Sequence, residues 1–339
     1  MALTLDVILP THNREALLRR TLDSLLRARR PVDLDLTILV VDNASSDGTR
    51  ALVRSQAPRF GERLHYLFEP TPGKPYALNS GIAATRGDLI GLIDDDEEID
   101  ETWFECIAGA FADPEVDFIG GKCLPIWGAP RPAWLGDGYL GVIGWVDPGA
   151  EPRSMDATYP GILMGGNAVI RRRSLEAAGP YSTALNRTGA RLLGCEDEDM
   201  YHRLLALGAR GRYVPGLVIH HDVPASRLTK RYFRRWCFWR GVSLGVLDRR
   251  RPRPVRYMLG IPRYMIGVAV RGAIDSARPP FGRGEAARIF MNELAWWDLA
   301  GFAYGKHCQR LDQYISRISR EKKTIAVRLR SQMAAGVRR

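Results

Sequence analysis

The sequence predicts an α/β fold, in which helices flank a mostly parallel central sheet. Short apolar runs rich in β-branched residues recur along the first hundred residues, at 3–9, 36–42, 64–68 and 88–94. Stretches with helical periodicity separate these runs. Strands that alternate with helices form parallel sheets whose two faces are both covered. With 339 residues and 45% hydrophobic composition, the chain can bury a large core, in one domain with an appendage or in two domains.

Polar motifs follow the predicted strands. We expect Asn13 to cap the helix after the first strand, and Ser46 or Asp47 to cap the helix after the second. Ligands of such sheets bind beyond the carboxyl ends of the strands. The site is therefore expected at three segments: PTHNR (10–14), DNASSD (42–47) and DDDEE (94–98).

The middle of the chain predicts a long loop and then a return to regular structure. Residues 125–160 are rich in Pro, Gly and Trp and have little periodicity, which favours a functional loop over the active face. We then expect a strand in GILMGGNAVIRR, with a close backbone approach at Gly165–Gly166. A helix in GCEDEDMYHRLLALG and a final strand in RYVPGLVIHH follow.

The cysteines and the N-terminus bear on the compartment. Five cysteines lie far apart without a C-x-x-C pair, which is a poor disulfide framework and a poor zinc site. This usage favours a reducing cytoplasm. The N-terminal MALTLDVILP has neither a basic leader nor a long apolar core, so we expect a first strand there and not a signal peptide.

Three adjacent carboxylates, Asp94, Asp95 and Asp96, follow the apolar run LIGLI. A solvated acidic loop is the ordinary explanation for such a run. Its place at the end of a buried strand favours a divalent ion instead, which would relieve the repulsion between the first and third carboxylates. Oxygen ligands and a diphosphate group favour Mg²⁺ or Mn²⁺ over zinc.

Five segments occur in one order along the chain: PTHNR, VVDNASSDGT, GKPYALNSGIAATRGDLIGLIDDDEEI, GGNAVIRR and GCEDEDMYHRLLALG. In this order and rough spacing, over residues 3 to 245, the chain resembles the inverting family 2 glycosyltransferases. The resemblance implies the GT-A nucleotide-sugar-binding fold. It also implies transfer of a sugar from a nucleoside-diphosphate sugar to the hydroxyl of a saccharide or a lipid-linked saccharide.

Two other functions stay open at this point. One is a nucleic-acid-binding protein with an inactive GT-A-like domain, which would explain a basic chain. The other is a sugar-nucleotide nucleotidyltransferase, although the Gly-rich basic phosphate loop of that class is missing from the N-terminal sequence.

The resemblance also implies roles for single residues in donor binding. The nucleobase and ribose pocket would be lined by Pro10, Thr11, Asn13 and Asp42, with Lys74 and Asn79 nearby. Asp94 would contact the ribose, and Asp96 would hold the metal that bridges the diphosphate. Asp95 would belong to the same nucleotide-sugar site. The ordinary alternatives are a turn residue for Asp42 and a surface lysine for Lys74.

Inverting transfer is a single displacement that needs a base for the acceptor hydroxyl. The Glu-Asp pair of the family maps onto Glu196 and Asp197 at a helix start, where the helix dipole favours ionised carboxylates. We expect Asp197 to be the base. Glu198 and Asp199 leave the register open, and ordinary helix-start acids are the alternative explanation.

The motif VIHHDV ends the last predicted strand with two histidines. Histidine pairs are often structural, but a histidine of this region completes the metal shell in some GT-A enzymes. We expect His220 ahead of His221 in that role. A single imidazole among oxygen ligands would favour Mn²⁺.

Charge is divided unevenly along the chain, whose formal net charge is +11. Residues 223–339 hold 26 Lys and Arg against 7 Asp and Glu, a net of +19, and residues 1–222 hold 23 against 31, a net of −8. We expect a catalytic domain in 1–222, with a nucleotide-sugar half in about 1–100 and an acceptor half in about 101–222. Residues 223–339 would form a basic, mainly α-helical extension.

The basic extension begins with RLTKRYFRRWCFWRG (227–241), which mixes aromatic residues with cations. The aromatic residues could pack against the catalytic domain, or they could lie at an anionic membrane surface. A transmembrane span is not expected at 257–274, because Pro262, Arg263 and Arg271 interrupt it. Nucleic acid is not the expected partner, since no nucleic-acid-binding signature accompanies the charge. We therefore expect a cytoplasmic protein that can attach peripherally to the inner face of the membrane.

Overall fold

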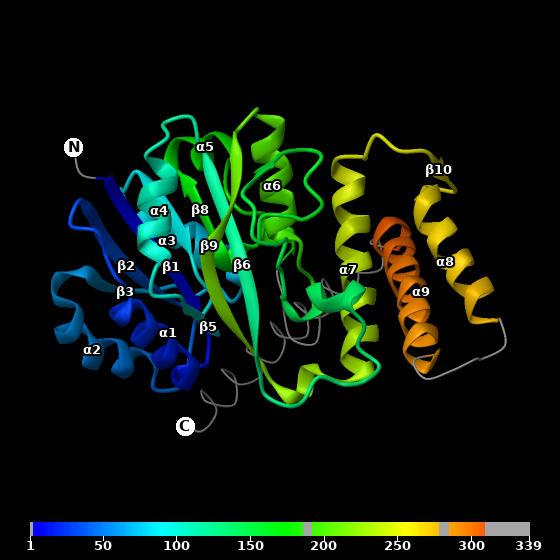
Figure 1. Cartoon of the computed structure of the whole chain (residues 1–339), viewed down its shortest axis with the longest axis horizontal. Coiled ribbons are helices and arrows are strands. Elements are labelled where there is room, and N and C mark those ends of the chain that lie inside the picture. The colour runs from blue at the N-terminus through cyan, green and yellow to red at the C-terminus, as the bar shows by residue number, and fades with distance from the viewer. Residues whose placement is uncertain (1–2, 186–191, 278–284, 309–339) are drawn as a thin grey trace, which may run out of the picture.

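The computed structural model describes residues 3–185, 192–277 and 285–308. In this part of the chain, one sheet of nine strands forms the centre of the molecule, in the order β3-β2-β1-β4-β8-β6-β9-β5, with β7 paired to β9. Helices lie on both faces of the sheet, and three further helices stand together beside it (Figure 1).

The first four strands form the parallel half of the sheet. β1 (Leu3–Thr11) lies between β2 (Leu34–Asp42) and β4 (Leu89–Leu92), and β3 (Leu64–Phe68) continues from β2. Between these strands run α1 (Glu15–Arg27), α2 (Thr49–Phe60), the short turn η1 (Gly61–Arg63) and α3 (Lys74–Ala84). The four apolar runs therefore form strands as predicted. Helices or loops cover both faces of this half of the sheet, so successive side chains of each strand are buried and apolar residues are favoured at all of them.

The second half of the sheet is mixed. β8 (Ala168–Arg171) runs antiparallel to β4 and β6 (Phe118–Trp127), while β9 (Gly211–Val223) runs parallel to β6 and antiparallel to β5 (Glu97–Ile99) and β7 (Arg153–Met155). The helices of this half are α4 (Trp103–Phe111), α5 (Arg172–Ala178) and α6 (Glu196–Ala206). The predicted α/β fold with a mostly parallel sheet is confirmed.

Two apolar cores hold the layers together. Side chains of α1, α2 and α4 pack on one face of the sheet, and side chains of α3, α5 and α6 on the other. Asn167, fully buried in the turn η3 (Gly165–Asn167), accepts a hydrogen bond from the indole of Trp103 and donates to the carbonyls of Lys122 and Leu217. These bonds fix the start of β8 against β6 and β9.

The predicted cap of α1 is wrong. Asn13 has a left-handed φ of 53°, and its side-chain oxygen accepts a hydrogen bond from the backbone of Ser46. Asp47 instead accepts from the backbone N–H groups of Glu15 and Thr49, which begin α1 and α2. One carboxylate therefore serves both helix starts, and Asn13 joins the two loops.

The predicted long loop follows β6 and contains the turn η2 (Asp137–Ile143). It packs on the C-terminal helices and not on the sheet alone. The ring of Trp134 meets Phe233 of α7 (Lys230–Arg250) edge-on at 5.1 Å between centroids, and meets Phe290 of α9 (Glu285–His307) at 4.9 Å. This loop and both helices form a third apolar core.

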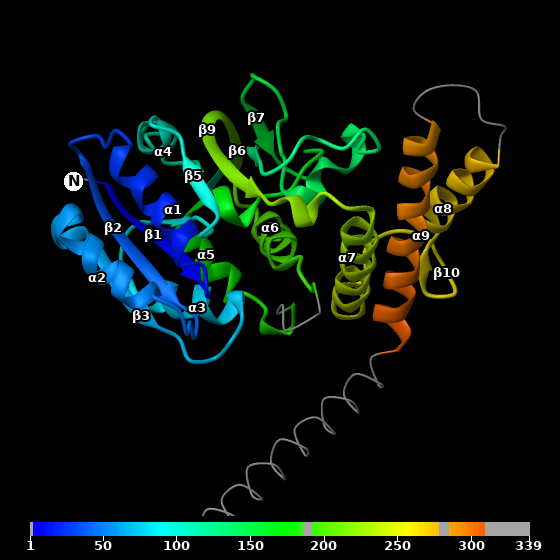
Figure 2. The ribbon, with the colours of Figure 1, turned by 90° about the horizontal axis from the view of Figure 1, so that it is seen from below.

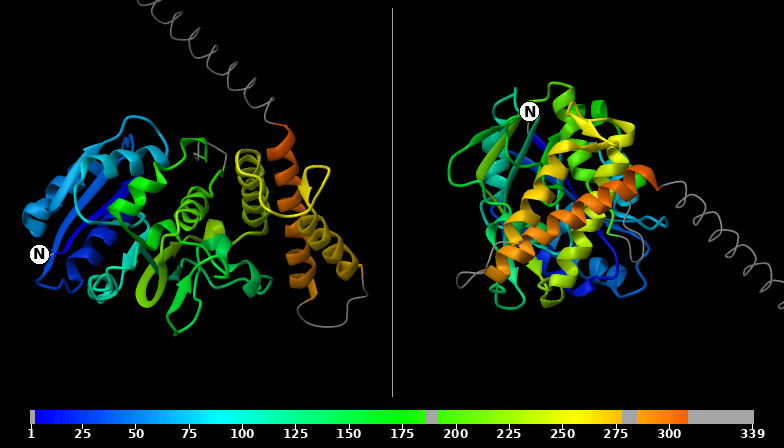
Figure 3. Two further views of the ribbon diagram at one scale, coloured as in Figure 1. Left: turned by 90° about the horizontal axis from the view of Figure 1, so that it is seen from above. Right: turned by 90° about the vertical axis from the view of Figure 1, so that its right-hand side faces the viewer.

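α9 lies between α7 and α8 (Arg263–Ser276), as Figures 2 and 3 show. Helices α7 and α9 pack closely through glycines that face each other. A Cβ on any of these glycines would collide with the backbone of the other helix. They are Gly241 and Gly245 on α7, and Gly301 and Gly305 on α9. The hairpin of β10 (Tyr257–Met258) and β11 (Ile261–Pro262) precedes α8. None of the helices described here is long and apolar enough to cross a membrane. Residues 309–339 of the basic extension lie outside the described residues.

Candidate active site

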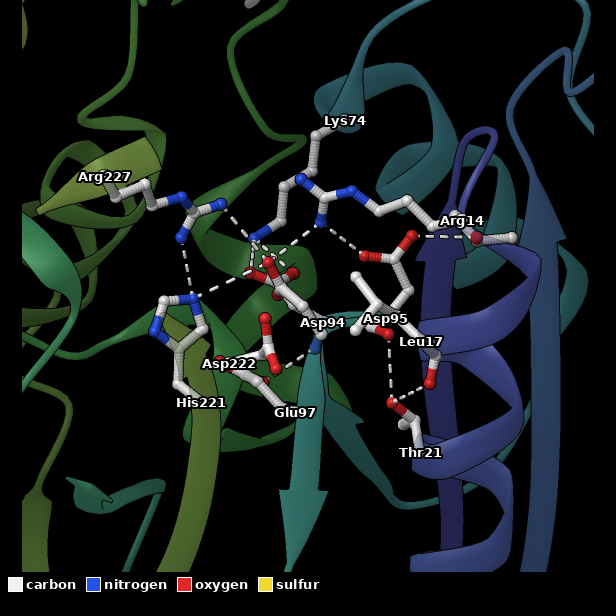
Figure 4. A network of polar contacts seen from close by, with 12 residues as sticks. Arg14, Leu17, Thr21, Lys74, Asp94, Asp95, Glu97, His221, Asp222 and Arg227 are labelled. Carbon is white, nitrogen blue, oxygen red and sulfur yellow. Dashed lines mark hydrogen bonds and ion pairs between the residues drawn. The ribbon is translucent and has the colours of Figure 1, made fainter. Parts of the chain in front are cut away.

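The three adjacent aspartates occupy the turn between β4 and β5, where two cations, Lys74 and Arg14, face them (Figure 4). Lys74, the first residue of α3, donates to Asp94 at 2.8 Å. Arg14 donates to Asp95 at 2.7 Å and to Asp96 at 2.9 Å. Cations from the first and third helical connections therefore offset the repulsion within the acidic turn.

Asp95 points into the protein, where it is 4% exposed. The hydroxyl of Thr11, at the end of β1, donates to it at 2.8 Å, and Arg14 occupies its other oxygen. Burial raises the pKa of Asp95 to about 6, against the opposing effect of Arg14. Both oxygens of Asp95 thus have protein partners, and the residue ties the end of β1 to the acidic turn.

Asp96 lies beside the end of β9. Its Oδ2 is 3.6 Å from Nε2 of His221 and 3.3 Å from the guanidinium of Arg227. Burial raises the pKa of Asp96, but its charged neighbours, Arg14 and then Arg227 among them, more than offset this and hold it below its usual range. Asp96 therefore stays ionised.

The structure places His221, and not the expected His220, next to Asp96. In β9 successive side chains point to opposite sides, and the buried positions alternate so that His221 is 9% exposed and faces inward. Pairing of β5 with β9 sets Glu97 opposite His221 and Glu98 opposite His220. The expectation for His220 does not fit this register.

Glu97 is a further buried acid of the site. Its carboxylate accepts a hydrogen bond from the backbone N–H of Asp94, and a Cβ on Gly166 would collide with it. Burial, and then Asp94 and Asp96, raise the pKa of Glu97 well above its ordinary value. The surroundings of Glu97 therefore disfavour its charged form.

Glu196 and Asp197 form the first turn of α6, across the site from Lys74. Burial raises the pKa of Asp197 to about 7, with Lys74 opposing the shift and Glu196 adding to it. Oε2 of Glu196 and Oδ1 of Asp197 are buried without a hydrogen-bond partner among the described residues. Buried oxygens without partners are uncommon and mark a place where a ligand can bind.

The predicted close backbone approach at Gly165–Gly166 is confirmed. A Cβ on Gly165 would collide with the carboxylate of Asp197, just as one on Gly166 would collide with Glu97. One glycine turn therefore lies directly against two acids that come from different elements. Neither position leaves room for a side chain without moving an acid.

The remaining expected donor residues gather at the carboxyl ends of β1 and β2, with one exception. Pro10 is buried in β1, and the carboxylate of Asp42 accepts from the backbone of Ser45 and from the hydroxyl of Tyr66. Asp42 thus does make the local turn that its ordinary explanation predicts. The exception is Asn79, whose amide clamps the backbone of Tyr181 through two hydrogen bonds, at 2.8 and 3.0 Å.

The described residues contain no group of three or more Asp, Glu, His or Cys side chains placed to hold a metal ion alone. Asp96 and His221 make a pair of donors. The other ring nitrogen of His221, Nδ1, lies 3.0 Å from the carbonyl oxygen of Ile143, which can only accept a hydrogen bond. Nδ1 therefore carries a hydrogen. Nε2 lies 3.0 Å from a guanidinium nitrogen of Arg227, which can only donate, so Nε2 accepts through its lone pair, as it would with a metal ion. Two protein ligands fit ions that take their other ligands from substrate phosphates and water.

Four residues of the site were missed or ranked too low from sequence: Arg14, Glu97, His221 and Arg227. Arg14 and Arg227 looked like ordinary surface cations, and Glu97 looked like the continuation of an acidic run. Sequence signals were available for three of them, since Arg14 lies within PTHNR, Glu97 within DDDEE and His221 within VIHHDV. The choice of His221 over His220 depends on the pairing of β5 with β9, and no local pattern indicated Arg227.

The comparisons with known proteins agree with this architecture. Residues 6–179 match the family model described as "Glycosyl transferase family 2". The succinoglycan biosynthesis protein ExoM of Rhizobium meliloti is 25% identical over 240 residues, which covers 68% of this chain and 72% of the relative. The glucosyl-dolichyl phosphate glucuronosyltransferase of Haloferax volcanii is 22% identical over 233 residues, 67% of this chain and 71% of the relative.

A solved structure shows the same fold. The mannosyltransferase PcManGT from Pyrobaculum calidifontis, in complex with GDP-Man and Mn²⁺, aligns with a TM-score of 0.56 and 20% identity over 90% of this chain and 87% of that chain. The GT-A fold is therefore confirmed. Because the family model covers just over half of the residues and the named relatives are glycosyltransferases or act in saccharide biosynthesis, this chain is a glycosyltransferase that belongs to glycosyl transferase family 2.

Proposed function

We propose that this chain transfers a sugar from a nucleoside-diphosphate sugar to a hydroxyl of a saccharide or lipid-linked saccharide, with inversion and with the help of Mn²⁺ or Mg²⁺. Asp197 carries the proposal. It is a buried carboxyl group with a pKa raised to about 7 and an unpartnered oxygen, close to Lys74 and the acidic turn. A base with a pKa near neutrality is well suited to take a proton from a hydroxyl group.

In the proposed step, the acceptor oxygen attacks the anomeric carbon from the side opposite the diphosphate. The bond between that carbon and the diphosphate oxygen breaks, and its electron pair stays on the diphosphate. The proton of the acceptor hydroxyl moves to the carboxylate of Asp197. Glu196, whose Oε2 is also unpartnered, would accept a hydrogen bond from a sugar hydroxyl and so hold the reacting groups in line.

The donor would lie along the carboxyl ends of β1, β2 and β4. Thr11, Asp42 and Asp94 are candidates for contacts to the nucleoside, with Pro10 and Asn13 at the edge of the pocket. Lys74 has a pKa that burial lowers and that Asp94, and then Asp197, raise above its ordinary value. It therefore stays charged between the donor side and the base. We assign Asp95 and Asn79 to support of this pocket, since protein groups take up their polar atoms.

We assign the metal to Asp96 and His221 in place of Asp96 and His220. A bound divalent ion would neutralise the charge that develops on the departing diphosphate. This chain's own part is to hold the carboxylate of Asp96 and Nε2 of His221 close together. The contact of Nδ1 of His221 with the carbonyl of Ile143 orients the ring for this.

Acceptor binding is proposed for the half of the catalytic domain at about 101–222, with the basic extension from 223 as its support. The names of two relatives, one in succinoglycan biosynthesis and one that acts on a glucosyl-dolichyl phosphate, favour a saccharide or lipid-linked acceptor. Nothing in the comparisons supports the nucleic-acid-binding or nucleotidyltransferase alternatives.

An anionic membrane surface is a proposed partner, but α7 is not the element that meets it. Phe233 of α7 is fully buried against the loop and α9, so its aromatic face already has a partner. α8 presents an outward face on which Tyr264, Val268, Val270 and Ile274 are 44 to 58% exposed. The exposed arginines of the same helix, Arg263 and Arg271, would meet lipid phosphates.

The direct test uses the purified protein with Mn²⁺ and a panel of nucleotide sugars. We expect donor hydrolysis and a donor-induced rise in unfolding temperature with one nucleotide sugar class, and NMR of the glycoside product should show the inverted anomeric configuration. Absence of both signals across the panel would refute the donor assignment, and retention of configuration would refute the single displacement. Salt-sensitive binding of DNA or RNA without donor hydrolysis would favour the nucleic-acid alternative.

A further inference from the structure

Arg227 bridges the two residues that we assign to the metal, Asp96 and His221, and Figure 4 shows it beside His221. It ends the short turn η5 (Ala225–Arg227), directly after β9. One arm of its guanidinium, Nη1, lies 3.0 Å from Nε2 of His221, and the other, Nη2, lies 3.3 Å from Oδ2 of Asp96. Its side chain is 20% exposed, so the head group is largely within the site.

These two contacts use the electron pairs that a metal ion would need. Nδ1 of His221 donates to the carbonyl of Ile143, and Nε2 accepts from Arg227, whose guanidinium can only donate. Oδ2 of Asp96 accepts from the other arm of the same guanidinium. The guanidinium therefore lies where a divalent cation would bind between the same two atoms.

We propose that Arg227 is a positioning residue. In the donor-free enzyme its guanidinium occupies the place of the metal ion between Asp96 and His221, and when ion and donor bind it moves to form an ion pair with the donor diphosphate. The inference rests on the metal-dependent function proposed above. A guanidinium and a divalent ion cannot both contact the same carboxylate oxygen without strong repulsion. When the ion binds, Arg227 must swing away, and the diphosphate brings the negative charge that can receive it. Its planar fork matches two phosphate oxygens.

Arg14 also contacts Oδ2 of Asp96, at 2.9 Å, but it differs from Arg227 because it stays paired with another carboxylate when an ion binds there. That second carboxylate is Asp95, at 2.7 Å. Loss of its contact to Asp96 would leave it paired. The two contacts of Arg227 described above are both to the metal pair itself, so ion binding disrupts both at once.

The arrangement predicts opposite effects on two equilibria when Arg227 is changed to Gln. Mn²⁺ binding without nucleotide, followed by electron paramagnetic resonance, should tighten by about tenfold, because a competing charged hydrogen bond is lost. Binding of a nucleoside diphosphate at saturating Mn²⁺, followed by calorimetry, should weaken by about tenfold or more. Arg227→Lys keeps the charge but not the fork and should fall between. Arg231→Gln, an exposed arginine on the first turn of α7, should change neither affinity.

Opposite signs separate this role from a merely structural one. Suppose that the wild type binds both Mn²⁺ and nucleotide. If Arg227→Gln then weakens its affinity for both, or changes neither affinity, the role of Arg227 is refuted and the proposed function stands. A wild type that binds nucleotide equally with and without Mn²⁺ would refute both metal dependence and the role of Arg227. Unfolding temperatures establish that the variants fold, and Arg227→Lys decides the question if Arg227→Gln does not.

Discussion

Replacement of Asp197 by Asn tests the proposed base through both stability and turnover. Burial raises the pKa of this carboxyl group from its ordinary 3.8 to about 7 in the folded protein. A group whose pKa is higher in the folded than in the unfolded state adds stability below its unfolded pKa, and that stability is lost as the pH rises through the folded value. Ionised Asp197 should therefore destabilise the fold, and an amide of the same shape should not.

The size of this effect follows from the two pKa values. At about 1.4 kcal/mol per pKa unit, ionisation of Asp197 in the folded protein costs about 4 kcal/mol, of which about 2 to 3 kcal/mol falls between pH 5 and pH 8. The free energy of unfolding of Asp197→Asn, minus that of the wild type, should therefore increase by about 2 to 3 kcal/mol over this range. Urea unfolding at four pH values, without metal or donor, measures it. Glu151→Gln, at an exposed site, is the matched control and should show no such trend.

Turnover should change in parallel. The wild-type rate should rise with pH up to about 7 and then level off, because only ionised Asp197 accepts the proton. Asp197→Asn should lose about a hundredfold or more in turnover with donor affinity nearly unchanged. The reasoning is refuted if the difference in free energy of unfolding between Asp197→Asn and the wild type does not change with pH and Asp197→Asn stays active. If Glu196→Gln is inactive in the same series, Glu196 is the base instead.

Three further predictions concern the metal, the helix pair and the membrane. Asp96→Asn should abolish transfer and Mn²⁺-dependent nucleotide binding without unfolding the protein, and turnover that survives both this change and chelation would contradict the metal site. Gly301→Ala should destabilise the fold by about 1 to 3 kcal/mol in thermal unfolding, because its Cβ would collide with the α7 backbone. The control Gly109→Ala, an open position on α4, should be neutral or stabilising, and equal effects would contradict the close packing. Binding to anionic vesicles should weaken by about tenfold or more when Arg263 and Arg271 are both replaced by Gln, and no binding of the wild type at low salt would refute the membrane surface.

The parallel strands and the glycine turn were predictable because their causes are local. An apolar run of four to nine residues that ends in polar residues is typical of a strand buried on both faces, and the runs before Thr11, Asp42 and Asp94 all behave in this way. The pair Gly165–Gly166 was likewise visible, since only a close neighbour explains two adjacent glycines at the start of a strand.

The choice of histidine was not predictable, because it depends on strand register. A shift of β9 by one residue would exchange His220 and His221 between the inner and outer sides. The pairing of β5 with β9 fixes that register, and β5 is only three residues long and acidic. In the same way, Arg227 meets Asp96 across 131 positions of sequence, a contact that no local pattern indicates.

Trp134 has a consequence for the exchange of parts between related enzymes. Its ring packs edge-to-face against both Phe233 and Phe290, so the loop after β6 contacts α7 and α9 through this one side chain. A chimaera that grafts only the C-terminal helices onto the sheet of a relative would lose this side chain and leave a cavity, at a cost of about 3 to 5 kcal/mol. The transferable module is therefore discontinuous, and the loop that follows β6 must travel with the helices.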